Sequence, residues 1–109
     1  MSFWGHEDVD SIDVAAVDAA LEKGALLIDL GEPSEWMHGH IPGALLVEPE
    51  LFEDELKKIE KTRPIIVAAR NKELAEEVVG TIRARGYSAV VLRGGIAAWT
   101  NAGRKLAQP

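Results

Sequence analysis

Short apolar runs recur along this chain, and each is bounded by glycine, proline or polar residues. The run at residues 65–68 is rich in β-branched side chains, as expected of a central strand. Continuous apolar runs of this kind are typical of strands that a parallel sheet buries on both faces. The pattern predicts strands at residues 11–12, 25–30, 44–47, 65–68 and 89–92.

Between these runs, apolar residues return at helical spacing. In residues 72–85, Leu74, Val78 and Ile82 share one face, and Gly86 is a natural C-cap. Four other helices are expected. The first has its N-cap at Asp13 and ends at Gly24, and the second is a brief turn capped by Ser34. The third begins at Pro49, and the fourth follows Gly94–Gly95.

Strands that alternate with helices imply crossover connections and parallel pairing. The sequence therefore predicts an α/β fold of three layers, a mainly parallel five-stranded sheet with helices on both faces. In such folds, sites form where strands end at their carboxyl edge. We expect a site among the loops that follow Leu30, Val47, Ala68 and Leu92.

The composition changes this picture little. With 109 residues and 47% hydrophobic content, the chain is large enough to bury one core, and it contains neither a linker nor an internal repeat. We expect a single domain at residues 1–109 with a core at about 11–104.

No apolar run approaches the roughly 20 residues that cross a bilayer, and no signal-peptide layout is present. The sequence predicts a soluble protein without membrane contact, with a cytoplasmic location as the default.

The charge is acidic overall, at −6, and this argues against nucleic acid as a partner because that binding needs clustered Lys and Arg. Its distribution is uneven. Residues 1–77 carry 7 basic and 18 acidic residues, a balance of −11, whereas residues 78–109 carry five basic residues and no acid. Either folding interleaves the two halves, which we favour, or the contrast serves a charged partner.

Cysteine is absent from the sequence, which excludes disulfides, thiolate metal sites and cysteine nucleophiles in this chain. His38 and His40 lie two residues apart with Glu35 nearby, but without a third strong ligand this spacing is weak evidence for a metal. The sequence predicts no metal site and no cofactor.

Four strings of residues, in this order, resemble the rhodanese homology domain. The most specific are the glycine-histidine-isoleucine-proline-glycine-alanine string at 39–44 and the glycine-glycine-isoleucine and tryptophan string within 92–99. The other two lie at 27–33 and 64–67. The resemblance spans about residues 11–104 and implies a rhodanese-like fold.

In that family, the loop after the fourth strand begins with a cysteine and an arginine and leads into a helix. Backbone N–H groups and the helix N-terminus lower the thiol pKa and hold an anion such as thiosulfate. The thiolate takes the sulfane sulfur and passes it to an acceptor. The resemblance places Ala69 at the cysteine position and Arg70 at the arginine position. Alanine has no atom that can attack sulfur.

The rest of this loop also departs from the family pattern. It contains no glycine or serine, is about one residue shorter, lacks a second arginine, and carries Glu73, which would oppose an incoming anion. Arg70 and Lys72 are either the remains of an anion site or two solvated charges. The candidate loop residues are Ala69, Arg70, Asn71, Lys72, Glu73, Leu74 and Ala75.

Three residues outside the loop are expected to support it. Arg93 either faces the same mouth or anchors its own loop. The resemblance implies a structural hydrogen-bonding role for His40. Asp29, at a strand end, is expected to hold neighbouring loop N–H groups.

Two hypotheses follow from the resemblance. The first is a non-catalytic rhodanese-like module that binds a protein partner or a small anion. The alternative is a thiosulfate or persulfide sulfurtransferase whose cysteine has been replaced by Ala69. The sequence offers no set of catalytic residues with which Asp29, Lys72 or Glu73 could carry out an unrelated reaction.

Overall fold

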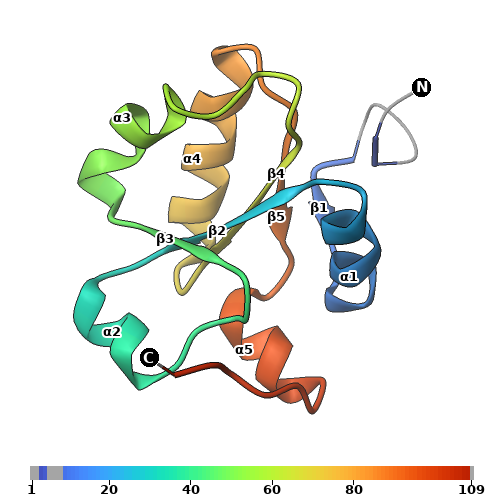
Figure 1. Ribbon diagram of the computed structural model, residues 1–109, viewed down its shortest axis with the longest axis vertical. Coiled ribbons are helices and arrows are strands. Elements are labelled where there is room, and N and C mark those ends of the chain that lie inside the picture. Colours follow the sequence, from blue (N-terminus) through green and yellow to red (C-terminus); the bar gives the residue numbers. More distant parts are fainter. Residues whose placement is uncertain (1–2, 5–8, 109) are drawn as a thin grey trace.

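The structure is a computed structural model that describes residues 3–4 and 9–108 (Figure 1). The ends of the expected domain, at residues 1–2 and 109, and residues 5–8 lie outside the described residues. In chain order the elements are β1 (Ser11–Ile12), α1 (Val14–Glu22), β2 (Leu26–Leu30), α2 (Pro33–His38), β3 (Leu45–Val47), the 3₁₀ helix η1 (Pro49–Leu51), α3 (Phe52–Leu56), β4 (Ile65–Ala69), α4 (Lys72–Ala84), β5 (Ala89–Leu92) and α5 (Gly95–Asn101).

The strands of the described chain form one sheet in the order β1-β5-β4-β2-β3, and each neighbouring pair of strands is parallel. This confirms the predicted α/β fold. β4 lies at the centre, where it pairs with β2 and β5, and Ala69 at its end is in register with Leu30. The carboxyl ends of β2, β4 and β5 therefore meet at one edge.

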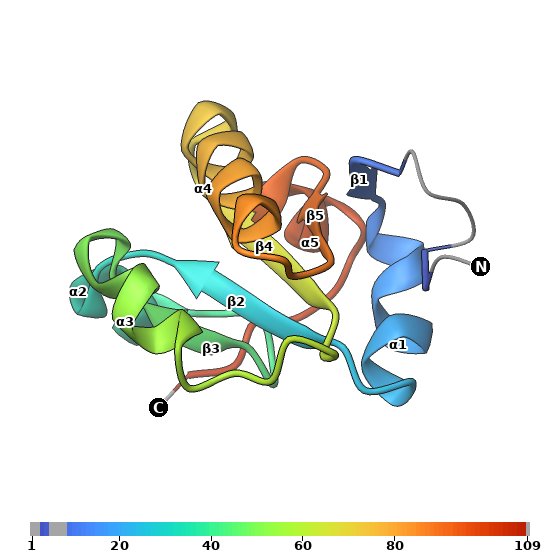
Figure 2. The same cartoon turned by 90° about the horizontal axis from the view of Figure 1, so that it is seen from above.

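Side chains alternate between the two faces of the sheet. On β4, Ile65, Val67 and Ala69 pack with the buried faces of α3 and α4, whereas Ile66 and Ala68 pack with those of α1 and α5. Figure 2 shows α3 and α4 on one side of the sheet and α1 on the other. Because both faces of the sheet are covered, its central strand is apolar throughout, as the uninterrupted run predicted.

Two helix starts differ from the sequence prediction. α2 begins at Pro33 with Glu32, not Ser34, as its N-cap. Proline suits the first helical position, and the Glu35 carboxylate accepts a hydrogen bond from the Glu32 N–H at 3.2 Å, which closes the helix start. Pro49 opens the 3₁₀ helix η1, and α3 follows it only at Phe52.

The C-terminal residues extend the packing beyond the predicted core limit at 104. The Trp99 indole N–H donates to the Lys105 carbonyl at 3.0 Å, and Ala107 and His40 exchange backbone hydrogen bonds at 3.0 and 2.8 Å. Leu106 lies against Gly39. This tail fastens the loop between α2 and β3.

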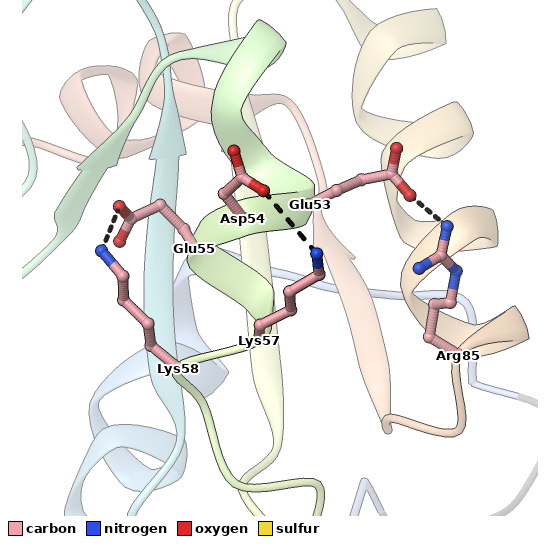
Figure 3. A network of polar contacts seen from close by, with 6 residues as sticks. All are labelled: Glu53, Asp54, Glu55, Lys57, Lys58 and Arg85. Carbon is pink, nitrogen blue, oxygen red and sulfur yellow. Dashed lines mark hydrogen bonds and ion pairs between the residues drawn. The ribbon is translucent and has the colours of Figure 1, made fainter.

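The uneven charge distribution is resolved by pairing across the fold, as we favoured. Arg83 pairs with Asp10 at 3.0 Å, and Arg104 pairs with Asp18 at 3.0 Å. Figure 3 shows a third such pair, between Arg85 at the end of α4 and Glu53 of α3. Each pair joins the basic last third of the chain to the acidic part, so the two charge blocks are in contact at three places.

None of the helices in the described part of the chain is long and apolar enough to cross a membrane.

Candidate functional site

Ala69 lies where the central strand ends, at the carboxyl edge of the sheet. Its side chain belongs to the core cluster beneath α4, and only 7% of the residue is exposed. The turn at the start of α5 covers the backbone of Ala69, because the Ala69 carbonyl oxygen is the atom nearest to where a Cβ of Gly95 would lie. A side chain at position 69 therefore faces packed atoms more than solvent.

The connection from β4 to α4 consists of two residues, Arg70 and Asn71. Asn71 is the N-cap of α4: its side-chain oxygen accepts from the Leu74 N–H at 3.0 Å, and its carbonyl accepts from the Ala75 N–H at 3.1 Å. Asparagine is among the best N-cap residues, so the sequence closes this helix start locally. The chain itself thus engages the Leu74 and Ala75 N–H groups, whereas the Lys72 and Glu73 N–H groups form no hydrogen bond with a described residue.

Arg70 leaves this helix start and reaches α2. Its Nε lies 2.8 Å from a Glu35 carboxylate oxygen, and both side chains are about half exposed, at 48% and 41%. The other Glu35 oxygen caps α2. The cation next to Ala69 is therefore already paired with an acid from another element, a partner that the sequence analysis missed because the two residues lie 35 positions apart.

Asp29 is the buried charged residue of the described chain, with 4% exposed. The sequence analysis expected it to hold loop N–H groups, but among the described residues no hydrogen bond to its carboxylate is formed. Burial raises the pKa of the Asp29 carboxyl above its ordinary value of 3.8. Positive charge on Arg70 and His40 offsets part of this pKa rise, and the Glu35 carboxylate adds to it.

His40 shapes the loop that runs beside Asp29. Its ring stacks on Trp36, with centroids 3.5 Å apart and planes 4° apart, and its Nδ1 lies 3.2 Å from the Trp36 carbonyl oxygen. His38 turns away to the Ser34 carbonyl, at 2.7 Å. Within the described residues no group of three or more His, Cys, Asp or Glu side chains could hold a metal ion.

Arg93 ties the end of β5 to β1. Its guanidinium donates to the Ser11 hydroxyl from Nε at 3.2 Å and from a terminal nitrogen at 3.1 Å, and its backbone N–H donates to the Ile12 carbonyl at 2.8 Å. This is the anchoring role that the sequence analysis considered. The following Gly94 and Gly95 both adopt positive φ, at 78° and 58°.

A cavity of about 650 Å³ opens beside Ala69 and runs between α4 and the β5–β1 edge of the sheet. It is hollow because small residues line it, including Ala75 and Gly80, and the Gly80 Cα faces open space. Its charged lining comprises four basic and two acidic residues: Arg70, Lys72, Arg83, Arg93, Asp10 and Glu76. The volume lies within the usual range for small-molecule sites.

The four cations of this lining are not equally available. Arg83 is held by Asp10, by the Ala89 carbonyl at 2.8 Å and by the Val9 carbonyl at 2.7 Å. Arg70 is paired, as described. Arg93 contacts a neutral hydroxyl, and Lys72 forms no ion pair with any residue that the structure describes. Lys72 and Arg93 are thus the lining cations without an acidic partner, and Glu76 is an acid of the same lining that forms no ion pair with a described residue.

The predicted site residues therefore separate into groups. Ala69, Arg70, Lys72, Ala75 and Arg93 line the cavity. Asn71 caps the helix, Glu73 is exposed, and Leu74 packs beside the core. Asp29 and His40 lie near Arg70 on the α2 side. The far end of the cavity, at Gly80 and Arg83, was not predicted, although helical spacing from Lys72 through Glu76 could have shown that these residues follow one side of α4.

Comparison with known proteins places these features in a family context. The family model of the rhodanese-like domain matches residues 13–102. A protein named sulfurtransferase from Allochromatium vinosum is 30% identical over 104 residues, which cover 93% of this chain and 97% of that protein. A probable adenylyltransferase/sulfurtransferase, MoeZ, from Mycobacterium tuberculosis is 34% identical over 76 residues, which are 67% of this chain but only 19% of that protein.

Solved structures give the same result for the fold. The Alr3790 protein from Anabaena superposes with a TM-score of 0.82 at 27% identity, covering 90% of this chain and 82% of that one. A rhodanese-related protein from Thermoplasma volcanium superposes with a TM-score of 0.82 at 21% identity, covering 92% and 99%.

Proposed function

The chain belongs to the rhodanese-like domain family, and on that premise we propose that it is a non-catalytic member that binds a protein partner or a small anion. Sulfur transfer by the family route needs a thiolate that becomes a persulfide. This chain contains no cysteine, and the position that corresponds to the nucleophile holds Ala69.

One observation carries the proposal: Ala69, at the position of the nucleophile, is only 7% exposed and has no atom that can attack sulfur, and the Asn71 cap takes part of the helix start beside it. The Leu74 and Ala75 N–H groups are bound by the side chain and the carbonyl of that residue. Had only the nucleophile been replaced, we would expect an open loop around it. The alanine at position 69, together with the other departures of this loop from the family pattern, favours a chain adapted to another role over a sulfurtransferase that has merely lost one sulfur atom.

The cavity beside α4 is the best candidate for the binding surface. Its lining contains Lys72 and Arg93 without an acidic partner, beside the acid Glu76, and includes small and apolar residues such as Ala75 and Val91. A cavity of about 650 Å³ exceeds the size of one inorganic anion. An acidic side chain of a partner, seated with part of its backbone, would use both the charge and the volume.

Catalysis is tested with thiosulfate as donor and cyanide as acceptor, by measuring thiocyanate. We expect no turnover by the purified chain. We also expect Ala69→Cys to gain no turnover while its circular dichroism and thermal midpoint match the parent chain. Turnover that appears in the folded Ala69→Cys variant would support the alternative, a sulfurtransferase whose cysteine was replaced.

Binding is tested separately, with thiosulfate and inorganic phosphate as probes in an NMR titration of backbone amides. We expect saturable shifts at Lys72, Arg93 and Gly94, and their loss in a Lys72→Glu, Arg93→Gln double variant. Lys57→Glu is the matched charge control because Lys57 is exposed on the distant α3–β4 segment. Equal shifts in both variants would mean that the probes only screen surface charge and would refute anion binding at the cavity.

A further inference from the structure

A second site lies on the opposite side of Arg70 from the cavity, above Gly31. We name it the Gly31 notch and define it by Asp29, Gly31 and Glu35. Gly31 has no side chain and is partly exposed. A Cβ built on it would lie 3.5 Å from a carboxylate oxygen of Asp29 and 3.6 Å from one of Glu35, with no other heavy atom within 4 Å outside its chain neighbours. Two carboxylates from different elements therefore converge on one unfilled point.

The Asp29 carboxylate makes this convergence unusual. The residue is 96% buried, given its 4% exposure, yet no described residue donates a hydrogen bond to it. No buried side-chain oxygen of the described residues lacks a hydrogen-bond partner, so the carboxylate oxygens of Asp29 reach solvent, and one of them lies 3.5 Å from the point where a Gly31 Cβ would stand. An acceptor that receives no donor from the described chain and is open at a glycine takes its donor from outside the chain.

Glu35, the second acceptor, is held in place. One of its oxygens binds Arg70 at 2.8 Å, and the oxygen that faces the notch also accepts from the Glu32 N–H at 3.2 Å. A carboxylate oxygen has two lone pairs, so this oxygen can accept one further donor. Both acceptors are therefore positioned before any ligand arrives, which reduces the entropy lost on binding.

We propose that the Gly31 notch binds a guanidinium group, the side chain of an arginine on a partner protein, between the carboxylates of Asp29 and Glu35. A guanidinium is planar and presents several N–H donors in a fixed fork, so it can donate to two separate oxygens at once. A Lys ammonium carries its charge at one point and is more strongly hydrated. Arg70 is already committed to Glu35, so it does not fill the notch.

This inference goes beyond the proposed function and does not depend on it. The notch is made by β2 and α2, whereas the cavity is made by α4, β5 and β1. A chain that transfers sulfur could still bind arginine in the notch, and a non-catalytic chain could lack that binding.

The test is an NMR titration of the full chain, labelled with ¹³C and ¹⁵N, that follows the Asp29 carboxyl carbon and the Gly31 amide. The probes are methylguanidinium, methylammonium and tetramethylammonium chlorides at constant ionic strength. We expect saturable shifts of both signals with methylguanidinium, at least about tenfold weaker binding of methylammonium, and no saturable shift with tetramethylammonium, which cannot donate. Equal responses to all three cations would overturn the proposal.

Variants locate the site. Asp29→Asn should abolish the saturable shift of the Gly31 amide. Gly31→Arg should abolish the saturable shift of the Asp29 carboxyl carbon, because the guanidinium of its own new side chain would occupy the notch. Gly31 has an ordinary backbone conformation and room for a Cβ, so this second variant remains informative if the first is poorly folded. Asp54→Asn, at an exposed acid on α3, is the control and should leave the titration unchanged. Undiminished methylguanidinium binding in Gly31→Arg would overturn the assignment.

The source of the arginine is tested with two further probes, free arginine and Nα-acetyl-arginine N-methylamide. The blocked form has no free amino or carboxyl group, as in an arginine within a chain, and we expect it to bind at least as tightly as the free amino acid. Binding of free arginine that is ten times tighter would assign a small molecule instead and overturn the partner side chain.

Discussion

Two turns leave neighbouring strands at the same edge of the sheet, and they are built in opposite ways. The turn from β5 to α5 depends on backbone contact: Gly94 and Gly95 have positive φ, and a Cβ at Gly95 would lie 2.3 Å from the Ala69 carbonyl oxygen. The turn from β4 to α4 depends on one side chain, the Asn71 cap. The first turn is fixed by sterics, whereas the second is an ordinary helix start that several residues could provide.

This difference separates the scaffold from the chemistry. The rigid turn packs directly on the backbone at the end of the central strand. The capped turn carries the residues that the family uses for sulfur transfer, and here it retains only Arg70 of the cysteine-arginine pair. A rhodanese-like domain thus keeps its architecture with an alanine at the end of its central strand.

The largest expected effect breaks the rigid turn. Gly95→Ala should cost about 3 kcal/mol in the free energy of unfolding, because the new methyl meets a backbone oxygen and the positive φ disfavours any side chain. Urea denaturation measures it. Gly80→Ala is the matched control: Gly80 lies inside α4 with open space around its Cα, so alanine should stabilise the chain by about 0.5–1 kcal/mol. A cost below about 0.5 kcal/mol for Gly95→Ala would show that this turn adapts easily.

The capped turn should give a smaller response. Asn71→Ala removes the acceptor of the Leu74 N–H and should cost about 1 kcal/mol in the same measurement. Asn71→Asp should keep the stability, because aspartate caps helices equally well. If alanine proved as stable as asparagine, the helix start would not depend on its cap, and the contrast between the two turns would fail.

The smallest effect concerns Asp29 of β2, which is in register with Ala68 of β4. Because burial raises its pKa in the folded state, the folded chain binds more protons than the unfolded chain just above pH 3.8, and stability falls as pH rises through that window. Asp29→Asn should therefore be more stable than the parent at pH 7, by less than about 1 kcal/mol, and the difference should vanish below pH 3.8. Lower stability of the variant at pH 7, with no added ligand, would show that the ionised carboxylate is stabilised in the fold.

Much of the fold could be predicted because its signals are local. The run at 89–92 became β5 with the predicted limits, and Asp13 caps α1, where its side chain accepts from the Ala16 N–H. Ser34 was predicted as the cap of α2 because serine is a preferred N-cap residue. The cap is Glu32, as indicated by proline at the first helical position and by Glu35 three residues after Glu32.

The site was less predictable because its contacts join distant segments. Arg70 pairs with Glu35, Arg93 binds Ser11, and the cavity continues along α4 to Arg83. None of these contacts is encoded by spacing along the chain. The empty hydrogen-bonding capacity of Asp29 was also invisible, since the sequence shows an acid at a strand end but not which N–H groups come within reach.

The most direct test of the central claim is the thiol pKa of Ala69→Cys. The parent chain has no cysteine, so the rate of alkylation by iodoacetamide as a function of pH reports this single thiol. With position 69 only 7% exposed and packed beneath α4, we predict a thiol pKa at or above the ordinary value of about 8.5. A thiol pKa below about 7 would mean that an anion cradle still surrounds position 69, and it would contradict the account.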